Sequence, residues 1–413
     1  MAESKLKVSR RNTFTFEGHA IVNKDTFTIN KTKEDGSWVH NALNMGVDCG
    51  PDHGVNYVSL MGGYAPNRDN NIIYLSTIDE NGQIQGKEHQ LQIAWENRLS
   101  LTEEDFEKIH SSNVINTYLE RGSDGKAINK KFISAYDAIA YIKEFVTDKS
   151  VVHISGHMEY RPSNETEGEW FTSHIIDSIT LKDEDRLIYR ATAKIAVLTD
   201  KDTMGKPNDE DKTVPLYMKT LTYVRSVNGK KYNQTCVVPV KAIFDYSNKE
   251  VLQGKNAGQM FDLLKNQYFS CEKTDMVDET VMNFFYRGGV KKVTAKFEDL
   301  PQDIQMGIKL GVIDEEQALG NLSIGGTAPR DLVFFSVETI GKDVKGDGDV
   351  TLRTSESLVS KCKYATSELL EFSDLEPIDT NGVTAPVDTS VEIDDEKVNE
   401  EVASILSMFN AIG

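Results

Sequence analysis

The chain has 413 residues, of which 39% are hydrophobic, and this length is enough for two or three domains. Its formal net charge of −19 argues against nucleic-acid binding by the surface as a whole. No apolar run reaches the roughly 20 residues of a membrane helix, and residues 1–14 lack an apolar signal segment, so we expect a cytoplasmic protein.

The charge is distributed unevenly along the chain. Residues 366–413 contain 12 acidic residues and one basic residue, so this stretch carries −11 and the first 365 residues carry −8. A body this weakly acidic can still hold a local basic groove. The polar and acidic composition predicts that residues 366–413 form a disordered tail.

Alternating apolar residues predict strands at the start of the chain. In residues 12–30, phenylalanine and isoleucine recur at alternate positions, interrupted at Gly18. Further strands are expected at residues 55–60, 72–78 and 90–95.

Two helices follow in the predicted order of elements. Residues 101–115 show a helical pattern, with Ser100 as the N-cap and Glu103 at capping-box spacing. Residues 134–146 place apolar side chains on one helical face and lead directly into a strand at 151–160.

A second region begins near residue 183. Its clearest element is a hairpin of residues 216–227 and 230–240, because Asn228–Gly229 between them supplies the positive φ angles of a type I′ turn. The other predicted elements are strands at 187–198, 282–297 and 332–340 and helices at 257–269, 304–310 and 315–319.

The sequence gives only weak indications of a metal-binding site. Three histidines, His153, His157 and His174, lie on neighbouring predicted strands, but no carboxylate or cysteine spacing completes a zinc set, and we interpret them as polar strand residues. The acidic loop at 343–350 departs from the EF-hand pattern. The four cysteines, at positions 49, 236, 271 and 362, are far apart and are expected to be reduced core thiols.

Motifs of catalysis are missing from the sequence. It contains no GxxxxGK[ST] loop, no nucleophile elbow and no HExxH helix. We therefore expect neither an enzyme nor a bound metal or cofactor.

Basic and aromatic residues alternate on several predicted strands. Binders of single-stranded nucleic acid use this combination, because bases stack on aromatic rings while cations follow the phosphates. In the hairpin, the residues at 217, 219, 221, 223 and 225 share one face. The candidate DNA-binding residues are Tyr64, Arg68, Trp95, Arg98, Tyr160, Arg161, Trp170, Tyr217, Lys219, Tyr223, Arg225, Lys230, Lys231, Tyr232, Tyr286 and Arg287.

One stretch resembles a known family. The helix SAYDAIAYIKEF, the strand VVHISG ending at Gly156, then Arg161, the turn Glu167–Gly168, Trp170 and the strand HIIDSITL follow one another in that order. This order is similar to the last two strands of the oligonucleotide-binding (OB) barrel in bacterial and phage single-stranded DNA-binding proteins. The start NTFTFEGHAIV resembles the family's first strand, bent at Gly18.

The resemblance implies a mainly β protein that binds single-stranded DNA without sequence preference, in replication or recombination. The size and architecture of the chain fit a phage protein, which would act in the cytoplasm of its host. We expect an OB-fold domain at residues 10–182, with Tyr160, Arg161 and Trp170 beside a hairpin that closes over DNA. A second β-rich domain is expected at 183–365, and a second OB-like barrel is one of the folds that it could adopt. The alternative is a virion structural or assembly protein built from β domains.

The end of the tail has a different pattern. Residues 398–409 are compatible with an amphipathic helix, which we expect to bind a replication or recombination protein. The predicted partner-binding residues are Val402, Ile405, Leu406 and Phe409.

Overall fold

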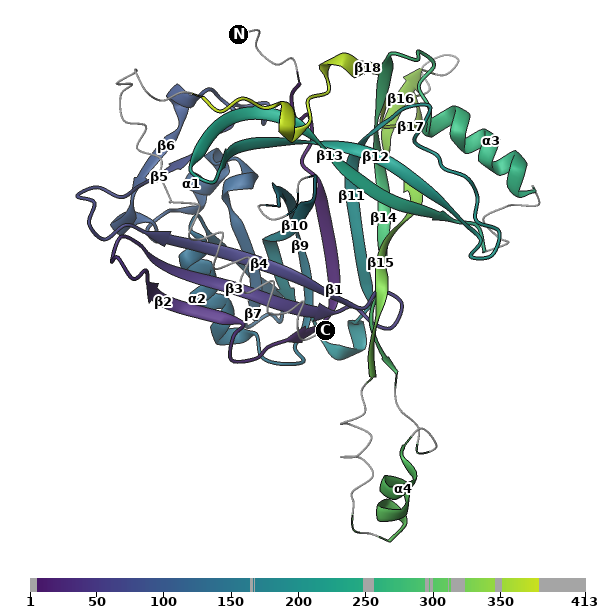
Figure 1. Cartoon of the computed structure of the whole chain (residues 1–413). Coiled ribbons are helices and arrows are strands. Elements are labelled where there is room, and N and C mark those ends of the chain that lie inside the picture. Colours follow the sequence, from purple (N-terminus) through teal and green to yellow (C-terminus); the bar gives the residue numbers. More distant parts are fainter. Residues whose placement is uncertain are drawn as a thin grey trace.

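The computed structural model describes residues 6–163, 166, 168–247, 256–293, 297, 300–310, 312, 324–345 and 351–378. Strands dominate it (Figure 1), which confirms the mainly β class predicted from the sequence. The α-helices of the described part are short: α1 (Glu103–Lys108), α2 (Ala135–Phe145), α3 (Ala257–Tyr268) and α4 (Gln302–Lys309). None of these is long and apolar enough to cross a membrane.

The first half of the chain forms a closed ring of five strands. In ring order they are β1 (Thr13–Ile21), β3 (Val39–Asp48), β4 (Val55–Tyr64), β10 (Trp170–Leu181) and β9 (Val151–Pro162), which returns to β1. The β4–β10 pair is parallel and the other pairs are antiparallel. Helix α2 lies between β4 and β9 in the chain, so this ring has the predicted OB-like plan.

A second ring repeats this plan. Its strands in ring order are β11 (Arg190–Thr199), β12 (Thr213–Val227), β13 (Lys230–Asp245), β15 (Ile324–Val337) and β14 (Met276–Val293), which returns to β11. The third and fifth strands again pair in parallel, and a helix, α3, again follows the third strand. The second region is therefore OB-like in its strand order, although no sequence repeat indicated it.

The two rings are joined by backbone hydrogen bonds. Residues 13–17 of β1 pair with β9 on one side and with β11 on the other, and β1 then pairs with β3 from His19 onward. The strand changes partner at Gly18, where an added Cβ would lie 1.9 Å from the Asp48 carbonyl oxygen. Because β1 of the first region pairs with β11 of the second, one sheet continues across the predicted domain boundary at residue 182. The domain limits 10–182 and 183–365 remain a prediction.

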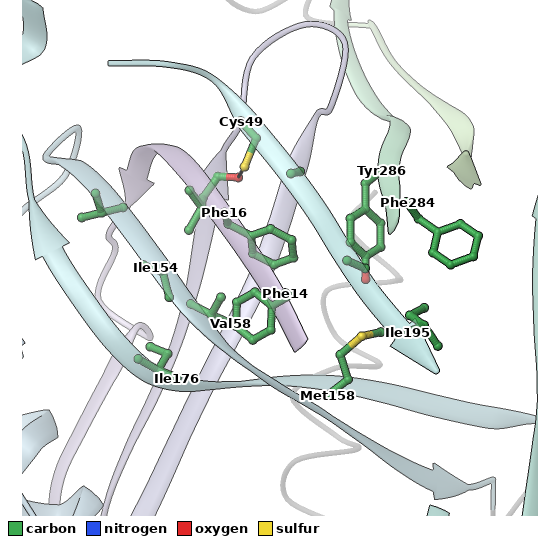
Figure 2. Packing of buried hydrophobic residues seen from close by; sticks show 14 of the residues in the cluster. Phe14, Phe16, Cys49, Val58, Ile154, Met158, Ile176, Ile195, Phe284 and Tyr286 are labelled. Carbon is green, nitrogen blue, oxygen red and sulfur yellow. Dashed lines mark hydrogen bonds between the residues drawn. The ribbon is translucent and has the colours of Figure 1, made fainter. Parts of the chain in front are cut away.

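One hydrophobic core spans both rings. Phe14 and Phe16 of β1 are almost fully buried, and Figure 2 shows them in the same cluster as Tyr286 and Phe284 of β14. The Phe16 and Tyr286 ring centroids are 5.5 Å apart. Alternation along β1 directs these rings inward, because successive side chains of a strand point to opposite faces.

Additional strands extend the sheet or form small hairpins. These are β2 (Phe27–Thr32) on β3, β7 (Ile115–Arg121) on β10, β8 (Ala127–Phe132) on β7, β18 (Val359–Ala365) on β14, and the pairs β5 (Ile72–Leu75) with β6 (Leu91–Ala94) and β16 (Thr339–Lys345) with β17 (Thr351–Ser357).

The helix predicted at 101–115 is wrong in extent. Helix α1 begins after Thr102, whose hydroxyl accepts the backbone N–H of Asp105 while the Asp105 carboxylate accepts the Thr102 N–H. This capping box replaces the predicted Ser100 cap. The chain enters β7 at Ile115 because its apolar side chains there join the sheet. The helix predicted at 315–319 lies outside the described residues.

Candidate nucleic-acid interface

The β12–β13 hairpin has the predicted turn, and most of β12 alternates between inward and outward side chains. Asn228 and Gly229 have φ angles of 51° and 71°, as a type I′ turn requires. Leu216 and Met218 point inward and are buried. On the opposite face, Tyr217 and Tyr223 are 56% and 55% exposed. Two large aromatic side chains are thus held in solvent by their strand position.

Basic side chains surround these tyrosines. Residues 213–245 contain five basic residues and one acidic residue, Asp245. Asp245 accepts a hydrogen bond from Arg287. Lys241 is exposed and lies directly opposite Tyr217 in the strand register, while Lys230 is exposed at the turn. The hairpin is therefore locally basic in a chain of net charge −19.

The register that places Lys241 beside Tyr217 depends on a bulge. At the turn, Val227 pairs with Lys230, but a shift between Val224 and Ser226 moves the later pairs by one residue. Without this shift, counting from the turn would place a valine opposite Tyr217. Lys241 was not among the predicted residues because the second strand of the predicted hairpin ended at residue 240.

Residues 369–378, here called the C-terminal segment, lie along the outer edge of β13. The Val237 N–H donates to the Leu370 carbonyl oxygen (2.9 Å), and the Ile378 N–H donates to the Lys231 carbonyl oxygen (2.7 Å). Leu375 is 6% exposed in a cluster with hairpin residues. The prediction that the acidic tail is disordered from residue 366 is therefore wrong up to residue 378, because apolar side chains within this stretch find partners on the hairpin.

The C-terminal segment occupies several predicted DNA-binding residues. The Phe372 ring packs against Tyr232 and Trp170, with centroid distances of 5.4 and 6.0 Å. The Glu371 carboxylate lies 3.2 Å from the Lys219 ammonium. These three candidates are thus engaged within the chain, by residues that the sequence analysis had assigned to a mobile tail.

The segment also contacts the outward face between the two exposed tyrosines. Leu221 lies between Tyr217 and Tyr223 on this face but is only 7% exposed, in a hydrophobic cluster against which Leu369 and Leu370 pack. The predicted common face therefore exists, but its centre is covered. A strand of nucleic acid that reached both tyrosines would have to pass over the start of the C-terminal segment.

A second aromatic cluster lies on the first ring. Tyr64 at the end of β4, Trp95 and Tyr136 of α2 contact one another at centroid distances of 5.0 to 5.8 Å. The Arg98 guanidinium lies 4.3 Å from the Trp95 ring and makes two hydrogen bonds, of 2.7 and 3.0 Å, to Asp137. Arg98 therefore fixes the cluster and has its charge neutralised. Tyr136 was missed, because its helix pattern predicted only a packing role.

Three other candidates have side chains that are buried, partly buried or paired with acidic residues. Tyr286 is 5% exposed, so its prediction as a stacking residue is wrong, and its strand position directs the ring into the core. Arg287 is paired with Asp245 and lies 3.9 Å from Asp331. Tyr160 is only partly exposed, and its hydroxyl oxygen accepts a hydrogen bond from the Asn12 side-chain amide at 3.0 Å.

The remaining candidates lie at the surface or beyond the described residues. Arg68 is exposed in the loop after β4, and Arg161 is exposed with its guanidinium 3.4 Å from the Glu159 carboxylate. Arg225 is exposed at the hairpin bulge, and Lys231 at the turn. The four predicted partner-binding residues of the terminal helix, at 402–409, lie outside the described part.

The histidines of the first ring do not face one another. His153 Nδ1 lies 2.7 Å from the buried Glu17 carboxylate. His174 is buried, with Nε2 2.7 Å from the Tyr286 hydroxyl. Both side chains are therefore held by separate partners within the fold.

His157 has a charged partner. It is buried, and its Nδ1 lies 2.8 Å from Asp177. Burial alone would lower the pKa of His157, but the hydrogen bonds that its ring donates to the Asp177 and Glu159 carboxylates outweigh burial and raise it. The ring is therefore more readily protonated than an ordinary histidine.

No protein-family model matches the chain, and a comparison with curated proteins also finds no match. Two crystal structures of the single-stranded DNA binding protein from Thermus aquaticus are similar to it in part. The deletion mutant is 7% identical at a TM-score of 0.27, over 67% of this chain and 87% of that chain. The wild-type protein is 6% identical at a TM-score of 0.26, over 67% and 85%. Values this low do not assign the chain to a family.

Proposed function

We propose that this protein binds single-stranded DNA on the outward face of the β12–β13 hairpin. The observation that carries the proposal is the pair Tyr217 and Tyr223, both more than half exposed on one face of a hairpin with five basic residues and one acidic residue. β12 and β13 are the second and third strands of their ring, and this is the face that binds oligonucleotides in OB-folds.

The chemistry of this face favours single strands over duplex. A tyrosine ring offers a stacking surface to any unpaired base, whereas the bases of a duplex already stack on one another. Neighbouring lysines attract phosphates without reading sequence. The proposed role is therefore sequence-independent binding, with no catalytic step.

The finer context is also a proposal. From the resemblance described above, we infer a role in replication or recombination, and from the size and architecture of the chain we infer a phage protein that acts in the host cytoplasm. The terminal residues Val402, Ile405, Leu406 and Phe409 would then recruit a partner protein, because an amphipathic helix commonly docks its apolar face in a groove.

The test compares binding of a labelled oligo-dT strand and of a duplex of equal length at two salt concentrations. We expect the single strand to bind more tightly and its affinity to fall as salt rises, with a slope of about −0.7 per phosphate contacted. Equal binding of the duplex, or affinity for the single strand that does not change with salt, would refute the proposal and favour an assembly role.

A further inference from the structure

The fold brings two distant cysteines together beside a buried carboxylate. Cys271 lies between α3 and β14, and Cys362 lies in β18. Their sulfur atoms are 3.5 Å apart although 91 residues separate them in the chain. One carboxylate oxygen of Asp278 completes a group whose three ligand atoms lie within 4.8 Å of one another. Cysteine spacing in the sequence indicated no such site.

We propose that Cys271, Cys362 and Asp278 form a binding site for a single Zn²⁺ ion. Thiolate sulfur and carboxylate oxygen are zinc ligands, with a Zn–S bond of about 2.3 Å. Two such bonds at a tetrahedral angle place the sulfur atoms about 3.8 Å apart, close to the observed separation. A disulfide needs about 2.05 Å.

The backbone around Cys362 is shaped to hold this arrangement. Cys362 has a φ angle of 47°, which a residue with a side chain rarely adopts. The β14–β18 register shifts between Val277 and Glu279, so that residues 361–363 bulge opposite Asp278. Within this bulge, the Cys362 N–H donates to Asp278 Oδ1 at 2.8 Å. Backbone strain of this kind is typical of functional positions.

The charges around the site balance once the ion is bound. Two thiolates and one carboxylate carry −3, and Zn²⁺ reduces this to −1. The Lys361 ammonium, 2.8 Å from Asp278 Oδ2, supplies the remaining positive charge. Asp278 is 1% exposed, and a buried charge is tolerated only when it is paired.

Binding would exchange protons for the ion. A cysteine thiol with its ordinary pKa of about 8.5 is mainly protonated at neutral pH without an ion. Zn²⁺ displaces one proton from each thiol and forms two Zn–S bonds and one Zn–O bond. Because Cys362 is only partly buried, a water molecule can take the fourth position.

Such an ion would link the segment before β14 to β18, the strand that leads into the C-terminal segment. Its role would be structural, and the proposal is independent of DNA binding.

The test uses the full chain, reduced and freed of metal, then equilibrated with Zn²⁺ or with Co²⁺ as a spectroscopic probe. We expect one Zn²⁺ per chain by elemental analysis and a thiolate-to-Co²⁺ charge-transfer band. Both should be lost in Cys271→Ala and in Cys362→Ala. Cys49→Ala, which removes a buried thiol elsewhere, should retain them.

A measurement on the unaltered chain covers the case in which these variants fail to fold. Zn²⁺ should protect Cys271 and Cys362 from alkylation, as located by peptide mass spectrometry, and leave the reactivity of the other two cysteines unchanged. A reduced chain that binds no Zn²⁺, or a variant with both Cys271→Ala and Cys362→Ala that still binds it, would overturn the proposal. So would a Cys271–Cys362 disulfide in protein purified under reducing conditions.

Discussion

Replacing Tyr217 and Tyr223 together by alanine tests whether the exposed hairpin face binds bases. Each ring is more than half exposed, so a base can stack on it, and each lost stack costs about 1–3 kcal/mol. Six residues separate the two positions, which corresponds to about 20 Å along a strand. Effects at this separation add, so the double variant should lose about 2–6 kcal/mol of binding free energy. This is a weakening of about 30-fold or more.

The assay is fluorescence anisotropy of a labelled oligo-dT strand, with thermal unfolding measured in parallel. Because both side chains are mainly exposed, their removal should change the free energy of unfolding by no more than about 0.5 kcal/mol each. Tyr189→Ala is the matched control, since Tyr189 is 43% exposed outside the hairpin. A folded double variant with wild-type affinity would refute the stacking argument. A large fall in the unfolding midpoint would show that the rings serve packing instead.

Further predictions concern charge, the C-terminal segment and pH. Changing Lys230 and Lys241 to glutamine should reduce the salt slope of binding by about 1.4 if both contact phosphates, and an unchanged slope would place the DNA elsewhere. Removing residues 369–413 should tighten DNA binding at low salt more than removing residues 379–413. Glu371→Gln should reproduce part of this gain, because it releases Lys219. If all three variants bind DNA as the full chain does, the C-terminal segment does not compete with DNA for the hairpin. The pKa of His157 is raised in the folded state, so its pairing with Asp177 stabilises the fold fully at pH values below the ordinary histidine pKa of about 6.5. This stabilisation is lost as the pH rises through the raised pKa. Urea unfolding should therefore show a larger difference between the wild type and Asp177→Asn at about pH 6 than at about pH 9, and a constant difference would contradict the assignment.

The elements that sequence analysis predicted well are those specified by local patterns. Asn228–Gly229 determines its own turn geometry, and period-two alternation determined that Tyr217 and Tyr223 share a face. Residues 134–146 predicted α2 from one amphipathic face. The strand β3 was missed because its sequence, VHNALNMGVD, mixes polar and small residues and is ordered by pairing on both sides.

The sequence by itself therefore determined the mainly β class, the hairpin with its exposed tyrosines and the acidic character of the C-terminal residues. Only the tertiary structure decided that the second region closes as a ring, since its parallel β13–β15 pair joins residues about 90 positions apart. The tertiary structure also decided which predicted DNA-binding residues are accessible, since Tyr286 is buried and Phe372 packs against Tyr232. It also brought Cys271 and Cys362 together. The physical reason is that turns and alternation depend on neighbouring residues, whereas burial, ion pairing and ligand geometry depend on residues that only long-range strand pairing brings together.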